Sequence, residues 1–485
     1  MLRNSEIKVS SFYHLWWKQM AGTDLRALSV MRIFIGLILF CDLFTRSMYL
    51  TAHYTDQGVL PRNFMTKMIW EKWFFSIHAW NGTFLWELFL FCLAGIFAGM
   101  LLVGYKTKLA TLVSWLFLIS LQNRNQYLLN GGDVLLRMTL FWSIFLPLGA
   151  RFSLDSFRNK VTSALQHEFI SLAGFAFLVQ VFFIYFFAGF SKLNGLWGSG
   201  FAMLNVVQMG DFVTRSAIKL THFPILLKGL NYYIFYSQLI LPFFLFSPLR
   251  NSVFRNAVLI NFVGLQLFIA IFFKLGIFPW VCVAVQVGLF PSSLINLIGS
   301  YLTQFKNHFS KRKVDLELSP VSGSLSGSKS NLLENRVVLF FLLYIFWWNL
   351  FSFDLVAFPK IFKPIGFILR IDQKWDMFRS ESITRSVSPV IILVDENGKE
   401  IKMDGFLRST LRSRNYTYYL PFVNDEEFRT NYCNFVCRDW NQSHLSGEKA
   451  QAVNLFVNEL NFQRDQPAKR NFHFFKSYPC NQKMN

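Results

Sequence analysis

The chain has 485 residues, of which 53% are hydrophobic, and it contains 58 Phe and 14 Trp residues. Soluble domains rarely have this composition, whereas proteins that cross a membrane several times often do. The formal net charge of +20 would suggest a nucleic-acid partner in a soluble protein, but here Lys and Arg fall mainly between apolar runs and in the C-terminal part. We therefore expect the lipid bilayer and its anionic headgroups, and no nucleic acid, as the counterpart of this charge.

The N-terminal segment, residues 1–26, lacks the continuous apolar core of a cleavable signal peptide, so we expect none there. It carries Trp16 and Trp17, and tryptophan is typical of segments at the boundary between lipid and water. We predict that this segment lies in the interface plane before the first membrane span.

Nine stretches of the chain are apolar over enough residues to cross a bilayer, or nearly so, which takes roughly 20 residues in a helix. We predict a polytopic α-helical membrane protein of about nine spans, the first eight of them in a helical domain at residues 27–300. The third stretch is the shortest. The nine stretches are residues 27–45, 84–105, 108–123, 134–150, 168–190, 231–248, 254–273, 276–298 and 336–357.

A flexible cytoplasmic linker is predicted at residues 301–335, because this segment contains the Ser- and Gly-rich run from Ser319 to Ser330. A last transmembrane helix follows at 336–358. The tail, residues 371–485, is predicted to form a small soluble α+β domain. Its signals are a hairpin turn at Asp395-Glu-Asn-Gly398, a helical pattern at 425–440 and an alternating strand pattern at 453–462.

The orientation follows from the positive charges in the loops. More Lys and Arg fall on the segments that face the cytoplasm if the N-terminus is cytoplasmic than on the opposite set. With nine spans, the tail is then extracytoplasmic. An error of one span would reverse the side on which the tail lies.

Three cysteines, Cys433, Cys437 and Cys480, lie in the tail. Outside the cytoplasm two of them are expected to pair. Cys433 and Cys437 are one helical turn apart, so both thiols face the same side of the predicted helix and could reach the same partner. We predict a disulfide from one of them, preferably Cys437, to Cys480. The alternative is three free thiols in a reducing compartment. No metal site is predicted, because no zinc-finger spacing occurs.

Ionisable residues beside apolar runs are the candidates for chemistry. Asp133 and Arg137 are four residues apart on one predicted helix and are expected to neutralise each other. Lys192 ends one of the most apolar helices of the chain, where burial would lower its pKa and make it a neutral base. The alternative, which periodicity alone favours, is a lysine that reaches out to the interface beside Trp197.

Several motifs of the chain resemble those of the HTTM (horizontally transferred transmembrane) family, whose best-known member is vitamin K-dependent γ-glutamyl carboxylase. Together they run in order through nearly the whole chain. The segments that carry the resemblance are Asn130-Gly-Gly-Asp-Val-Leu-Leu-Arg137 with its continuation to Asp155, Tyr185-Phe-Phe-Ala-Gly-Phe-Ser-Lys-Leu-Asn-Gly195, Asp372-Gln-Lys-Trp-Asp-Met-Phe378 and Cys437-Arg-Asp-Trp-Asn441.

The resemblance implies a mechanism and a cofactor. In the carboxylase, a lysine at the end of the equivalent helix removes a proton from reduced vitamin K-type quinone. Oxygen adds, and the resulting alkoxide takes a γ-proton from a substrate glutamate, whose carbanion takes up CO₂. By the motif match, this catalytic lysine is Lys192, and the partner of the reaction would be a polypeptide substrate.

The chain also departs from the carboxylase. Asn125 and Gln266 stand where that enzyme has histidines, and Ser191 replaces one lysine of its Lys-Lys pair. The region that grips the substrate's recognition sequence is missing. We expect Asn125, Tyr127 and Asn130 to form the polar wall of the site, with Trp197 nearby and Gln266 as a further candidate for contact with the quinone or substrate.

Two functions remain open at this point. One is a quinone-linked carboxylase or oxygenase that uses Lys192. The other is a non-enzymatic membrane factor for the maturation or export of a partner polypeptide. The enzymatic interpretation requires an uncharged Lys192, so it predicts that neither Glu87 nor Asp133 lies within salt-bridge reach of the amine.

Overall fold

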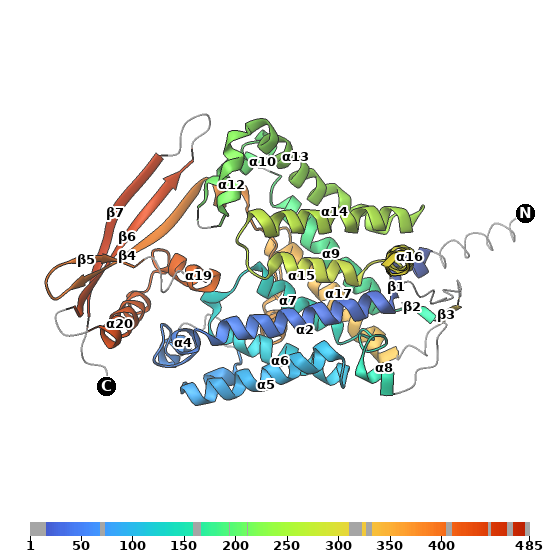
Figure 1. The fold of residues 1–485 in the computed structure, drawn as a ribbon, viewed down its shortest axis with the longest axis horizontal. Coiled ribbons are helices and arrows are strands. Elements are labelled where there is room, and N and C mark those ends of the chain that lie inside the picture. The colour runs from blue at the N-terminus through green and yellow to red at the C-terminus, as the bar shows by residue number, and fades with distance from the viewer. Residues whose placement is uncertain are drawn as a thin grey trace, which may run out of the picture.

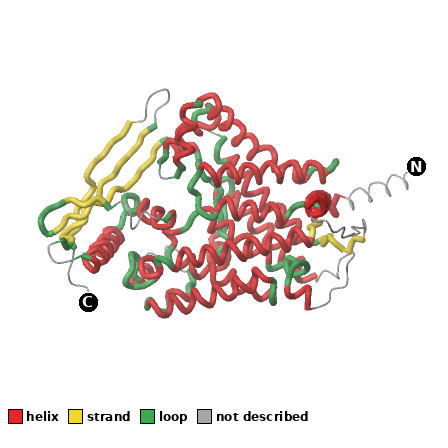
Figure 2. The backbone as a smooth tube through the Cα atoms, viewed as in Figure 1, coloured by secondary structure: helices red, strands yellow, loops and turns green. Residues whose placement is uncertain are grey.

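The computed structural model describes residues 16–67, 73–158, 166–193, 195–210, 212–309, 323–325, 332–403, 410–444, 448–462 and 469–480. Long helices lie side by side in a bundle, with a twisted sheet at one end and the first described residues at the opposite end (Figure 1). Figure 2 shows that strands are confined to these two ends. Residues 1–15 and most of the predicted linker lie outside the described residues.

In the described residues, the bundle is built from ten longer helices and several short ones. The longer helices are α2 (Leu25–Ser47), α5 (Phe84–Val103), α6 (Thr107–Arg124), α7 (Gly131–Ser143), α9 (Leu172–Phe190), α13 (Pro224–Ile240), α14 (Asn251–Phe272), α15 (Phe278–Gly288), α16 (Ser292–Phe309) and α17 (Leu332–Ser352). The short helices and 3₁₀ turns are α3 (Leu50–Tyr54), α4 (Arg62–Lys67), η1 (Ile77–Ala79), η2 (Gln126–Leu128), α8 (Leu154–Arg158), α10 (Leu196–Ser199), α11 (Ala202–Gln208), α12 (Arg215–Lys219), η3 (Leu220–His222), η4 (Leu241–Phe246), η5 (Lys360–Phe362), α18 (Lys363–Leu369) and η6 (Ser380–Ile383).

The number of membrane spans differs from the prediction. Within the described residues, six helices are long and apolar enough to cross a bilayer: α2, α5, α9, α13 continued by η4, α14 and α17. The pair α15 and α16, bent by 100°, adds a seventh if it counts as one span. The protein is therefore a multi-pass membrane protein, but nine spans are not confirmed.

The two remaining predicted spans fall on α6 and α7, and each falls short for a physical reason. The last turn of α6 is polar, with Gln122, Asn123 and Arg124 all buried inside the protein. Helix α7 has 13 residues. At about 1.5 Å per residue it covers about 20 Å, less than the roughly 30 Å of a hydrocarbon core.

Helix α9 is the central element for the site. Ser171 caps its N-terminus by accepting a hydrogen bond from the Gly174 backbone N–H at 3.0 Å. Gln180 is its one strongly polar residue in an otherwise apolar sequence. At Gly189 the backbone of α13 approaches so closely that a Cβ would lie 2.6 Å from the Leu239 nitrogen. Any larger residue there would push α9 and α13 apart.

Two small sheets mark the two ends of the bundle. At the end where α2 and α9 begin, β1 (Gly22–Asp24), β2 (Gln166–Ile170) and β3 (Gly323–Leu325) form a three-stranded sheet in that order. The tail forms an antiparallel sheet of order β5-β4-β6-β7 at the other end. Its elements are β4 (Arg385–Asp395), β5 (Glu400–Lys402), α19 (Leu411–Tyr419), α20 (Glu426–Ser443), β6 (Ala450–Asn461) and β7 (Lys469–Pro479).

The tail shares a hydrophobic core with the end of the helical bundle. Tyr416 and Phe428 of the tail belong to the same buried cluster as Leu121 of α6 and Leu128 of η2. A second, larger core fills the interior of the bundle. The predicted helix and strand signals in the tail fall on α20 and β6. The tail therefore packs on one end of the bundle through α19 and α20, and the sheet lies on the outer side of these helices.

A disulfide joins Cys437 of α20 to Cys480, which follows β7, and Cys433 is buried and free. We expect this bridge in protein isolated from membranes if the tail is extracytoplasmic, as the loop charges predict. Mass spectrometry without reduction should find the Cys437–Cys480 peptide pair. Cys480→Ser should destabilise the tail by about 2–4 kcal/mol, whereas Cys433→Ala should leave the bridge intact. Three free tail thiols would contradict both the bridge and the orientation.

Candidate active site around a buried lysine

Lys192 lies two residues beyond the end of α9, at the end of the bundle that carries the tail. Its backbone N–H donates to the Gly189 carbonyl at 3.0 Å, which closes the turn after the helix. Its side chain is buried, with 3% exposed. The amine Nζ donates to the carbonyls of Ala188 at 2.8 Å and Met377 at 3.1 Å. The lysine therefore points into the protein and does not reach out to the interface.

Beside Lys192 is a cavity of about 60 Å³. A water molecule needs about 10–15 Å³ measured in this way, so the cavity has room for several water-sized groups. Helices α9, α11, α13 and α14 and the segment after α17 all contribute to its wall. The lining residues are Ile184, Tyr185, Ala188, Lys192, Trp197, Met203, Val206, Ile234, Gln238, Gln266, Ile269, Phe273, Leu275, Phe278, Met377 and Phe378.

Two buried amide oxygens at this cavity have no hydrogen-bond donor within the part of the chain that the structure describes. They are Oε1 of Gln238 and Oε1 of Gln266. The Gln266 amide nitrogen donates to the Tyr185 hydroxyl at 3.0 Å, which fixes that side chain. Buried acceptors without a donor are unfavourable. A ligand with hydroxyl groups would satisfy them.

The electrostatic environment favours the neutral amine. Burial lowers the pKa of Lys192 to about 7, and the carboxylate of Asp376 opposes this shift. The indole ring of Trp197, 5.3 Å from Nζ, favours the ammonium form as well. Desolvation by burial is the largest cause of the shift and outweighs the effect of Asp376. Asp376 itself pairs with Lys374 at 3.5 Å, so Lys192 is an amine with no carboxylate partner among the described residues.

The segment after α18, residues 370–378, covers the site next to the end of α9. The Trp197 indole N–H donates to the Phe378 carbonyl at 2.8 Å, next to the Met377 carbonyl that accepts from Lys192. Further along, Gln373 accepts a hydrogen bond from Gln180 of α9 at 2.8 Å. The region from α9 to Trp197 and residues 373–378 are thus joined by hydrogen bonds at both ends of the later segment, although they lie 180 or more positions apart in the sequence.

The model of the HTTM domain matches residues 21–293, more than half of the chain. The chain belongs to the HTTM family. This confirms the resemblance drawn from the motifs, and it fits a membrane protein related to the carboxylase family. No curated protein and no solved structure matches the chain.

Asp133 and Arg137, which lie in one of the HTTM motifs, do not pair with each other as expected. Asp133 binds Arg46 of α2 at 2.5 Å and Arg412 of the tail at 2.9 Å. Arg137 binds Asp372, just after α18, at 3.2 Å. The i,i+4 spacing allowed the pair, but stronger partners on other elements take both side chains. The predicted ion pair is wrong.

The predicted polar wall of Asn125, Tyr127 and Asn130 is also wrong, because none of the three lines the cavity. The Asn125 amide donates to the His53 carbonyl at 3.0 Å. Tyr127 packs against tail aromatics, with ring centroids 4.7 Å apart at Phe428. Asn130 caps α7. All three lie where the HTTM helices meet the tail, which a loop sequence alone does not reveal.

The residues that take their place are Gln238 and Tyr185, which the motifs did not indicate as site residues. Of the predicted candidates, Lys192, Trp197 and Gln266 do line the cavity. Gln238 and Gln266 both interrupt apolar helices. An uncharged amide inside an apolar helix is, like a charged residue, a sign of a functional position, and this is the sequence signal that indicates Gln238.

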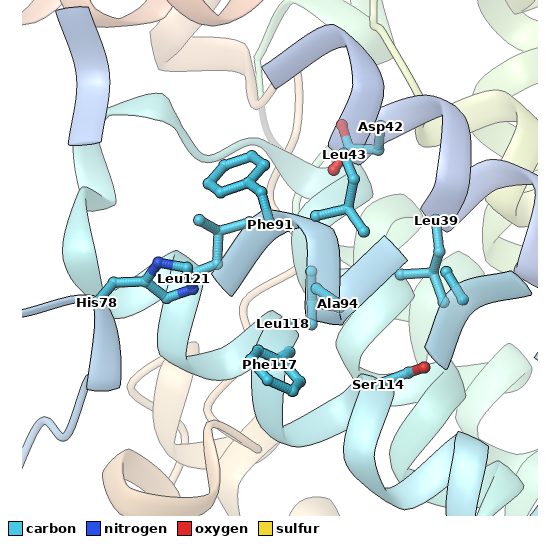
Figure 3. A pocket seen from close by; sticks show the side chains of 11 residues that line it. Leu39, Asp42, Leu43, His78, Phe91, Ala94, Ser114, Phe117, Leu118 and Leu121 are labelled. Carbon is cyan, nitrogen blue, oxygen red and sulfur yellow. The ribbon is translucent and has the colours of Figure 1, made fainter. Parts of the chain in front are cut away.

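A second pocket of the HTTM region, about 20 Å³ in volume, lies between α2, α5 and α6 (Figure 3). Leu39, Leu43 and Phe117 give it mainly apolar walls. His78 at its edge contacts the buried Glu87 carboxylate at 2.6 Å. As expected, neither Glu87 nor Asp133 forms an ion pair with Lys192: Glu87 contacts His78, and Asp133 binds Arg46 and Arg412. Within the described residues, no group of three His, Cys, Asp or Glu residues could hold a metal ion.

Proposed function

We propose that this HTTM protein is a membrane enzyme in which Lys192 removes a proton from a reduced, lipid-soluble quinone of the vitamin K type. One observation carries the proposal: a buried amine without a carboxylate partner among the described residues lines a mainly apolar cavity that also holds two unpartnered amide oxygens. Perturbed, desolvated groups of this kind concentrate at functional sites.

The cavity residues fit the head group of a reduced quinone. Such a head group is aromatic and carries two hydroxyl donors, which match the free oxygens of Gln238 and Gln266. The apolar wall, including Phe273 and Phe278, matches its ring. When bound, the reduced quinone would supply an acidic hydroxyl and the electrons for a reaction with oxygen.

The hydrogen bonds of Lys192 suit a base. A neutral amine has two N–H hydrogens, and the carbonyls of Ala188 and Met377 accept two hydrogen bonds. The lone pair is then left free for a proton from the ligand. With a pKa of about 7, a large fraction of Lys192 is unprotonated near neutral pH. The carbonyls hold the nitrogen in one place while it gains and loses the proton.

The orientation is part of the proposal. We place the N-terminus in the cytoplasm and the tail outside it, on the basis of the loop charges. Strand β1 and the tail sheet lie at opposite ends of the bundle, which fits this arrangement. Lys192 then lies near the extracytoplasmic end of α9.

Carboxylation of glutamate is the least supported part of the resemblance. Asn125 and Gln266 replace two histidines of the carboxylase, and Asn125 bonds the His53 carbonyl away from the cavity. We therefore propose oxygenation of the quinone as the reaction and leave the second substrate open. The alternative function, a non-enzymatic factor for the maturation or export of a polypeptide, does not need a neutral lysine.

The direct test is to incubate the purified protein with a reduced vitamin K-type quinone and oxygen and to follow epoxide formation. Turnover above the rate without protein is expected. Folded protein that forms no epoxide with several reduced quinones, in the presence or absence of CO₂ and glutamyl peptides, would favour the non-enzymatic alternative.

A further inference from the structure

The strand β7 forms a free edge of the tail sheet. It pairs with β6 through ten of its eleven residues on one side, and no described strand lies on its other side. In an antiparallel ladder, every second residue of an edge strand turns its N–H and C=O outward. An edge of this length offers a template for one more strand.

The face of the sheet away from α20 carries exposed aromatic side chains next to this edge. Phe472 and Phe474 are 56% and 54% exposed. Phe456 of β6 stacks on Phe472 with centroids 5.2 Å apart and contacts Phe474 at 5.4 Å. The alternate residues of β6, such as Val453 and Leu455, are buried on the other face. Adjacent exposed aromatics of this kind mark interaction surfaces.

The edge also carries positive charge that the described part of the protein does not neutralise. Lys469 and Arg470 are exposed and have no ion-pair partner among the described residues. The neighbouring cations differ, because Arg385 pairs with Glu459 at 2.6 Å and Lys476 with Glu426 at 2.7 Å. Two copies of β7 side by side would bring like charges together, which disfavours self-pairing.

We infer that the β7 edge binds an extended, acidic segment of a partner polypeptide as an additional strand of the sheet. Backbone hydrogen bonds to β7 provide affinity, and alternate apolar side chains of the segment lie on Phe472 and Phe474. Its carboxylates lie near Lys469 and Arg470. About six residues, extending over roughly 20 Å, are enough to cover the aromatic and basic part of the edge. This inference does not depend on the chemistry at Lys192.

A basic edge strand can also protect a sheet from unwanted pairing or contact anionic lipids. The experiment distinguishes both of these roles from the addition of a strand. Lysines and bulges protect edges from pairing, and the pairing of β6 with β7 shifts register between Leu455 and Phe456. A basic surface outside the membrane could also contact anionic lipid headgroups. Protection of the edge predicts no peptide binding at all, and lipid contact predicts binding to vesicles instead of peptides.

The experiment uses the full chain in nanodiscs of zwitterionic lipid and a fluorescent eight-residue peptide of alternating Glu and Val. Saturable binding by anisotropy is expected, with a loss of at least tenfold for Phe472→Ser/Phe474→Ser and for Lys469→Glu/Arg470→Glu. Lys399→Glu/Lys402→Glu, at the exposed β4–β5 hairpin, also reverses two charges, so it is the charge-matched control and should bind like the unmodified protein. Intact Cys437–Cys480 pairing in each variant shows that the tail is folded.

Two further probes make the outcome decisive. A peptide of the same sequence, N-methylated at alternate residues, cannot add as a strand and is expected not to bind. Absence of binding by the unmethylated peptide, equal binding by both peptides, or a response only to vesicles containing phosphatidylglycerol would each overturn the inference.

Discussion

Replacing Lys192 by Ala, Gln or Arg is expected to reduce quinone epoxidation by about 10²–10⁴-fold, the usual contribution of a positioned general base. Arg is the informative variant. It keeps a cation of similar length, but a guanidinium is never neutral in this pH range and cannot accept a proton. The measurement is the rate of epoxide formation by each purified variant. Lys228, exposed on α13, provides the control: Lys228→Ala should retain the rate.

The rate of epoxide formation should also depend on pH if Lys192 is the base. The active form is the unprotonated amine, so the rate should rise as the pH rises through about 7 and become constant above it. Stability should also rise with pH between about 7 and the ordinary lysine range, since only the unfolded chain binds the proton there. For the same reason Lys192→Met should stabilise the protein at neutral pH while abolishing activity. A Lys192→Arg variant with an unchanged rate would contradict the base assignment.

Arg412→Ala is expected to destabilise the protein by about 3–5 kcal/mol, the typical effect of removing one partner from a buried charge pair. Arg412 of α19 reaches into the bundle and binds Asp42 at 2.5 Å and Asp133 at 2.9 Å. Arg46 is the second cation of the same cluster and binds both carboxylates. Without Arg412, two buried carboxylates share one arginine, and α19 loses its ion pairs with the helices.

The measurement is the unfolding of the detergent-solubilised variant followed by a tail-specific signal, such as proteolysis within α19. Arg385→Ala is the control, because Arg385 is 53% exposed and its pair with Glu459 should be worth less than about 1 kcal/mol. Adding Asp42→Asn to Arg412→Ala should recover part of the loss, since it restores the charge balance. Equal stability of Arg412→Ala and Arg385→Ala would show that the cluster contributes little.

The helical architecture could be predicted because it depends on local composition. Every predicted apolar stretch falls on a helix, from α2 to α17. What composition did not distinguish is whether a helix crosses the bilayer or lies inside the protein. In α6 and α7 the polar groups are covered by neighbouring elements: Gln122 donates to the Asp133 carbonyl at 3.0 Å. Such coverage is a property of the packed bundle.

Without the family resemblance, which indicated Gln266 of α14, the site could be predicted only where one segment carries the chemistry. Lys192 and Trp197 are five positions apart, and the turn after α9 brings them together. The carbonyl of Met377 and the cation of Arg412 come from distant segments, and Arg412 meets Asp42 across 370 positions. Nothing in the spacing near Asp133 indicates that a tail arginine will displace Arg137. Ion pairs between residues so far apart in the sequence depend on how the tail packs on the helical bundle.

The contact of Lys192 with Met377 has a consequence for the order of biosynthesis. Residues up to 293, the whole matched HTTM domain, can leave the ribosome and insert before Met377 and Phe378 exist. Until those residues dock, one wall of the cavity is missing, and water can reach the amine and keep it protonated. We therefore expect the newly made helical domain to be inactive in the proposed reaction. In the mechanism that we propose, Lys192 can act as a base only after the last helix has inserted and the segment around Met377 has docked on the turn after α9.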